Sequence, residues 1–104
     1  MKALKVGLVS LFIPLGALAA ALPEAMFILD ASGSMAEDAG GRTKMAAAQA
    51  VLAQVVPAVA PEVKLGLAAY GHRRPNDCAD IEILVPPGTE DRAAVLARVS
   101  ALQP

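Results

Sequence analysis

The sequence predicts an α/β fold with a mixed sheet and the element order β-α-β-β-α. Three observations predict it. A short continuous apolar run occupies residues 25–29, apolar residues recur at helical spacing after Thr43 and again after Thr89, and apolar and polar residues alternate over 63–71 and 79–86. The chain has 104 residues and no internal repeat, so it is long enough for one small domain at most.

Residues 1–21 have the build of a secretory signal peptide. Lys2 and Lys5 precede an apolar stretch from Val6 to about Leu18, and the small residues that follow fit an A-x-A cleavage site. This stretch is short for a membrane-spanning helix, which needs about 20 apolar residues, although an uncleaved anchor is the alternative. We therefore expect an exported protein, periplasmic or secreted, whose mature chain of residues 22–104 has no stable membrane span.

The charge and the aromatic content argue against nucleic acid as a partner. Once Lys2 and Lys5 are removed, seven basic residues face ten acidic ones, and the mature net charge is −3. No basic patch is present to neutralise phosphates, and the three aromatic residues of the whole chain form no platform on which bases could stack. Cys78 is the single cysteine, so a free thiol and a bond to another chain are both open.

The first strand and the first helix follow from local patterns. Residues 25–29 are apolar without alternation, which is typical of a strand that is covered on both faces. After a loop at 36–42, Thr43 can cap a helix that Pro57 and Pro61 would end. The predicted apolar side of this helix consists of Met45, Ala48, Leu52, Val55 and Val56.

An antiparallel hairpin and a second helix are predicted for the rest of the chain. The polar loop HRRPND separates the two alternating segments. Their apolar positions are Val63, Leu65, Leu67 and Ala69 in the first segment, and Ile81, Ile83 and Val85 in the second. Thr89 can cap the second helix, with Glu90 and Asp91 placed favourably against the helix dipole. The apolar stripe of this helix comprises Val95, Leu96, Val99 and Leu102.

A cluster of small oxygen ligands follows the first strand. Asp30, Ser32 and Ser34 form a D-x-S-x-S pattern, with Gly33 between the two serines. Ligand sites of open α/β sheets collect where strands end, and a carboxylate with two hydroxyls suits Mg²⁺ or another small divalent cation. Taken alone, the pattern is also typical of a turn whose serines cap backbone groups.

Three segments carry a resemblance to a known family. They resemble the opening half of a von Willebrand factor type A domain, and most of all the bacterial exported kind. The three segments are FILDASGSM, GRTKMAAAQAVLAQVV and VKLGLAAYGH. The resemblance covers the mature chain from about Glu24 to Pro104. It implies a Rossmann-like, doubly wound α/β fold of which residues 22–104 would be the N-terminal half, with the C-terminal half missing.

The resemblance also implies a binding function. Asp30, Ser32 and Ser34 match the first loop of the family's metal-ion-dependent adhesion site. In that site the serine hydroxyls bind Mg²⁺ directly, the aspartate commonly acts through water, and an acidic side chain of a partner protein takes an open position. No bond is made or broken, so we expect a binding module and no enzyme.

The chain departs from the family pattern in its length. The other two ligands of such a site, a threonine and an aspartate from later loops, would lie past Pro104, and neither Thr43 nor Thr89 stands at a matching place. Three ligands within five residues predict weak Mg²⁺ binding. We therefore expect a truncated fragment that binds Mg²⁺ weakly or has lost its binding function.

Other functions match the sequence less well than this one. An aspartic protease needs D-[ST]-G-[ST], and Ala31 shifts that register by one residue. No nucleophile elbow and no phosphate-binding P-loop motif occurs. A soft metal site of His72, Asp77, Cys78 and Asp80 competes with the simpler interpretation of a solvated loop. The alternative function is a metal-independent interaction fragment that adds a strand to another protein.

Overall fold

The computed structural model describes residues 2–3, 7, 10 and 22–104 of the chain. Nearly all of the predicted signal peptide, residues 1–21, lies outside the described residues, so export stays a prediction. Within the described part of the chain, no helix has both the length and the apolar character that a membrane crossing requires.

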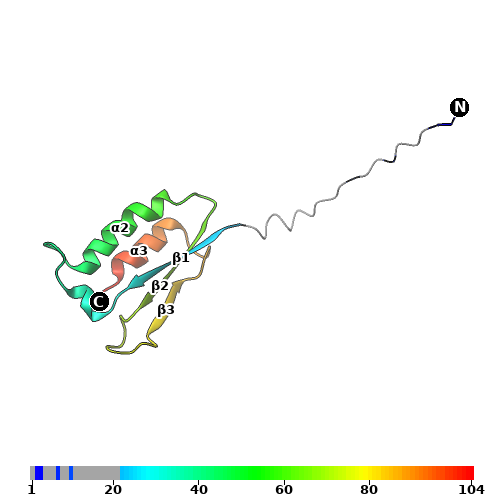
Figure 1. The fold of residues 1–104 in the computed structure, drawn as a ribbon. Coiled ribbons are helices and arrows are strands. Elements are labelled where there is room, and N and C mark those ends of the chain that lie inside the picture. The colour runs from blue at the N-terminus through cyan, green and yellow to red at the C-terminus, as the bar shows by residue number, and fades with distance from the viewer. Residues whose placement is uncertain (1, 4–6, 8–9, 11–21) are drawn as a thin grey trace.

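The predicted element order is confirmed. Three strands and two helices follow one another as β1 (Glu24–Asp30), α2 (Lys44–Ala58), β2 (Lys64–Tyr70), β3 (Ile81–Val85) and α3 (Arg92–Ala101), and a short 3₁₀ helix η1 (Gly33–Ala36) follows β1. The sheet order is β1-β2-β3, with β1 parallel to β2 and β2 antiparallel to β3. Both helices lie against the same face of this mixed sheet (Figure 1).

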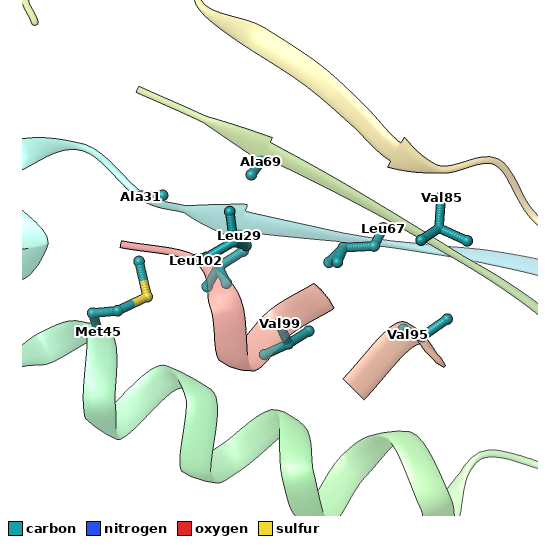
Figure 2. Close-up of a cluster of buried hydrophobic side chains, with 9 residues drawn as sticks. All are labelled: Leu29, Ala31, Met45, Leu67, Ala69, Val85, Val95, Val99 and Leu102. Carbon is teal, nitrogen blue, oxygen red and sulfur yellow. The ribbon is translucent and has the colours of Figure 1, made fainter. Parts of the chain in front are cut away.

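The core lies between the helices and the covered face of the sheet. Figure 2 shows its members converging from all three strands and both helices. They are Leu29, Ala31, Met45, Leu67, Ala69, Val85, Val95, Val99 and Leu102. Leu67, on the central strand, has no exposed side-chain surface. Because Leu29 in β1 and Ala31 just past its end both lie in this core, packing fixes the place where the Asp-Ser pattern begins.

The strand β1 is covered on one face only, so the prediction of a strand buried on both faces is wrong for it. Leu29 is buried, but Ile28 is 70% exposed because no helix of the described residues covers that face. The central strand β2 is the one with both faces buried, from Leu65 to Ala69. A side chain at Gly66 has no room, because a Cβ there would lie 2.8 Å from the carbonyl oxygen of Val85 and 3.0 Å from the Met26 side chain.

A register shift in β3 corrects the predicted face of the hairpin. Leu67 pairs with Val85 and Ala68 pairs with Ile83, so one residue of β3 is unpaired between them. This bulge turns Val85 toward the core, whereas Ile83 faces outward and is 62% exposed. The simple alternation that placed Ile81, Ile83 and Val85 on one buried face is therefore wrong.

The predicted N-cap residue is confirmed for α2 and is wrong for α3. Thr43 caps α2, and its Oγ1 accepts a hydrogen bond from the backbone N–H of Ala46 at 3.0 Å. The predicted cap at Thr89 is wrong, because Asp91 caps α3 by accepting from the N–H of Ala94 at 2.8 Å. The predicted apolar side of α2 also changes: Met45 and Val56 are buried, but Val55 is 40% exposed.

Each helix caps the end of the other. The Gln49 side chain of α2 donates to the carbonyls of Val99 and Leu102, at 3.0 and 3.1 Å, where α3 ends. The Arg92 guanidinium at the start of α3 donates to the carbonyls of Val56, Val59 and Ala60 at the end of α2, at 2.6–2.7 Å. These bonds satisfy carbonyls that a helix end leaves without partners.

Candidate functional site

The residues of the D-x-S-x-S pattern lie together at the carboxyl end of β1. We call residues 30–34 the DxSxS loop. Asp30 is the last residue of β1, and the loop then enters η1 at Gly33. The N–H of Ala31 donates to the carbonyl of Tyr70 at 2.9 Å, which continues the β1–β2 ladder past the strand end. The loop therefore starts from a backbone that is fixed by the sheet.

The three predicted side chains form a row of oxygen atoms. Ser32 Oγ donates to Asp30 Oδ1 at 2.7 Å, and the same carboxylate oxygen accepts from the Ser32 N–H at 2.9 Å. Ser32 Oγ lies 3.3 Å from Ser34 Oγ. The structure thus brings together the residues that the sequence singled out.

This row fits a small divalent cation by its chemistry. Oxygens on adjacent corners of an octahedron around Mg²⁺ are about 2.9 Å apart, given Mg–O distances of about 2.0–2.1 Å. The spacing of 3.3 Å between the Ser32 and Ser34 hydroxyl oxygens is close to this value, and the 2.7 Å hydrogen bond to Asp30 orients the Ser32 hydroxyl. Because the Ser32 proton points to Asp30, the lone pairs of the Ser32 hydroxyl oxygen stay available for a cation.

The electrostatics favour an ionised Asp30. The hydrogen bond from the Ser32 hydroxyl lowers the pKa of the Asp30 carboxyl, and partial burial opposes it without reversing the shift. The N–H of Ser32, the Tyr70 hydroxyl and the charge of Lys44 lower this pKa further. In turn, the carboxylate of Asp30 raises the pKa of the Tyr70 phenol. The DxSxS loop therefore carries a negative charge at neutral pH.

A second segment borders the loop. We call residues 71–80 the hairpin turn, since they connect β2 to β3. The DxSxS loop and the hairpin turn line a depression of about 560 Å³. Its lining residues are Ser32, Gly33, Ser34, Gly71, Arg74, Pro75, Asn76, Asp77 and Cys78. The sequence did not predict that the two segments meet. The parallel pairing of β1 and β2 places the carboxyl ends of these strands side by side and so brings the segments together.

The hairpin turn is organised by Asp80, whose side chain is buried. Its Oδ2 accepts from the N–H groups of Arg73 and Arg74, both at 2.7 Å, and its Oδ1 accepts from Arg73 Nε at 2.7 Å. Burial raises the pKa of the Asp80 carboxyl, but these hydrogen bonds outweigh burial and hold the pKa far below its usual range. This role of Asp80 was not predicted from the sequence.

The alternative metal cluster in the hairpin turn does not assemble. Asp80 is engaged by Arg73, and Asp77 Oδ2 accepts from Arg74 Nε at 2.7 Å. Cys78 is exposed and forms no disulfide in this chain. Across the described residues, no three His, Cys, Asp or Glu side chains gather in a way that could hold a metal ion. The serine-containing DxSxS loop is thus the candidate site that the geometry supports.

Comparison with known proteins identifies one family. The family model described as von Willebrand factor type A domain matches residues 25–104. This range includes all of the DxSxS loop, the hairpin turn and both helices. No curated protein matches the chain significantly.

Proposed function

We propose, since this chain belongs to the von Willebrand factor type A family, that its DxSxS loop binds Mg²⁺ and, through Mg²⁺, an acidic side chain of a partner protein. Domains of this family often mediate protein interactions, which fits a binding role. The observation that carries the proposal is the row of Asp30, Ser32 and Ser34 oxygens at 2.7 and 3.3 Å. We further propose that the protein is exported and that it acts by binding, without catalysis.

The two serines and the aspartate of the loop would have different roles. Ser32 and Ser34 would offer their hydroxyl oxygens to the cation, which supplies positive charge for a carboxylate of the partner. Asp30 accepts the Ser32 proton and so orients that hydroxyl, and its ionised carboxylate stabilises a nearby cation. We expect a low affinity, because Mg²⁺ gives up its water reluctantly and the loop offers two neutral hydroxyl ligands with a single carboxylate beside them.

Metal titration of the full chain tests the proposal. Mn²⁺ serves as a paramagnetic probe for the Mg²⁺ site, and its binding is measured by electron paramagnetic resonance with Mg²⁺ as competitor. We expect Ser34→Ala to weaken binding about tenfold or more, as loss of one ligand or its support commonly does. Ser100→Ala is the matched control, because Ser100 is exposed on α3. Equal Mn²⁺ affinity in both variants, or no binding by the wild type, would contradict the proposal.

A second candidate function is strand addition to a partner. It is favoured by the position of β1, which is an edge strand of the described sheet and has Ile28 exposed on its open face. Exposed edges pair readily with further strands. Once a partner protein is known, its binding separates the two functions: adhesion through the cation is lost with EDTA and with Ser34→Ala, whereas strand addition is indifferent to both.

A further inference from the structure

Gly71, the first residue of the hairpin turn, lies directly against the DxSxS loop. Its backbone is in the left-handed region, with φ of +78°. A Cβ atom at this position would lie 2.8 Å from the Cβ of Ser32 and 2.9 Å from its Cα. Carbon atoms that are not bonded to each other do not approach so closely, and the Ser32 Cα is backbone, which cannot swing aside like the end of a long side chain. Only glycine fits here without a shift of one of the two segments.

The hairpin turn is held too firmly to absorb that shift. The N–H of Gly71 donates to the carbonyl of Asp80 at 2.9 Å. The buried carboxylate of Asp80 in turn holds the N–H groups of Arg73 and Arg74 at 2.7 Å each. Hydrogen bonds therefore hold the backbone of the turn at Gly71, Arg73 and Arg74, which all lie within three residues of Gly71.

The DxSxS loop is held less firmly at the contact. Its start is fixed by the hydrogen bond from Ala31 to Tyr70. Ser32 itself bonds to near neighbours in sequence: its N–H and hydroxyl donate to Asp30, and its carbonyl accepts from the N–H of Met35 at 2.9 Å. Ser34 lies 3.3 Å away on the exposed side. A side chain at position 71 would therefore displace Ser32 rather than the hairpin turn.

We propose that Gly71 is a positioning residue for the cation site: the missing side chain lets Ser32 keep its hydroxyl between Asp30 and Ser34. This inference rests on the proposed function for its consequence in metal binding. Its structural part, that residue 71 sets the position of Ser32, does not depend on a metal. Gly71 would touch neither the cation nor the partner, and would act through Ser32 alone.

Gly88 provides a matched control. It has nearly the same backbone conformation, with φ of +75°, so a side chain at either position meets the same backbone strain. A Cβ at Gly88 would meet the Lys64 side chain, with Cδ at 3.0 Å, and this flexible side chain can move away. Gly88 bonds to Leu65 at the amino end of β2, the end opposite to the DxSxS loop.

The test compares Gly71→Ala with Gly88→Ala in the full chain, by two measurements. In EDTA, nuclear magnetic resonance records the amide chemical shifts of residues 30–34 and the Cβ shifts of Asp30, Ser32 and Ser34; with Mn²⁺, electron paramagnetic resonance records affinity. We expect Gly71→Ala to change the shifts around Ser32 and to weaken Mn²⁺ binding about 10- to 100-fold, as loss of a supporting contact does. We expect Gly88→Ala to change neither, although both variants lower the melting temperature.

The two measurements separate failure of this inference from failure of the proposed function. Unchanged shifts at Ser32 in Gly71→Ala would overturn the inference, whatever the affinity for Mn²⁺. If the wild type binds no Mn²⁺, the proposed function fails, and the shifts in EDTA still decide whether Gly71 positions Ser32. If Gly71→Ala does not fold, Gly71→Asn and Gly88→Asn replace the pair, because asparagine adopts the left-handed region more easily, as Asn76 does in this turn at φ of 55°.

Discussion

Replacing Arg92 by glutamine should destabilise the fold strongly, although the residue lies far from the candidate site. Its guanidinium donates to three carbonyls at the end of α2, at 2.6–2.7 Å. Two of these contacts, to Val56 and Val59, are partly buried, and the third, to Ala60, is exposed. The first two therefore dominate the expected loss, because water can replace Arg92 at Ala60.

The size of the effect follows from these contacts. A hydrogen bond to a charged group contributes about 1.5–3 kcal/mol, and a positive charge at a helix C-terminus contributes about 0.3–1 kcal/mol more. Glutamine keeps one donor group and restores part of this, so we expect a loss of about 2–4 kcal/mol in the free energy of unfolding. For a domain of this size, that corresponds to a fall in melting temperature of roughly 10–25 °C.

Thermal and urea unfolding, followed by circular dichroism, measure this loss. Arg98→Gln is the control on the same helix, because Arg98 is half exposed and reaches only Glu90, at 3.3 Å. An exposed ion pair of this kind contributes about 0–1 kcal/mol. If Arg92→Gln costs no more than Arg98→Gln, the carbonyls at the end of α2 do not depend on Arg92, and the reasoning from the hydrogen bonds is refuted.

Three further outcomes are expected from the fold. Hydrogen bonds hold the pKa of Asp80 in the folded state below its value in the unfolded chain. The contribution of Asp80 to stability is therefore present above about pH 4 and is lost as the pH falls. The melting temperature should thus drop less between about pH 5 and pH 2 in Asp80→Asn than in the wild type. Asp91→Ala should lose about 1 kcal/mol of unfolding free energy by removing the α3 cap, and an equal loss in Thr89→Ala would show that the cap is assigned to the wrong residue. Leu67→Ala should lose about 2–5 kcal/mol, whereas Ile83→Ala, on the exposed face, should lose under about 1 kcal/mol; similar urea midpoints for these two variants would contradict the burial of the central strand.

Features that depend on neighbouring residues were predicted well. The order of strands and helices, the cap at Thr43 and the grouping of Asp30, Ser32 and Ser34 all involve residues within a few positions of one another. Local hydrogen bonds and the period of the apolar residues decide such features, and both can be read from a single segment. The predicted cap at Thr89 failed within the same range, because Asp91 is an equally good capping residue two positions further on.

Features that depend on the partner of a strand were predicted poorly. The burial of β1 on one face and the outward turn of Ile83 follow from the place of each strand in the sheet and from the bulge opposite Leu67 and Ala68. The same apolar sequence can form an edge strand or a central strand. The sequence patterns of these strands therefore could not show which faces the helices would cover.

The sequence by itself determined the order of the elements and the grouping of the Asp30, Ser32 and Ser34 oxygens, because each arises from a few consecutive residues. Only the tertiary structure decided which distant residues meet the ends of these elements. The parallel pairing of β1 with β2 brings Gly71 against Ser32, and the packing of the two helices brings Arg92 to the end of α2 and Gln49 to the end of α3. The physical reason is that these contacts join residues 32 to 53 positions apart, so strand register and helix packing set their distances.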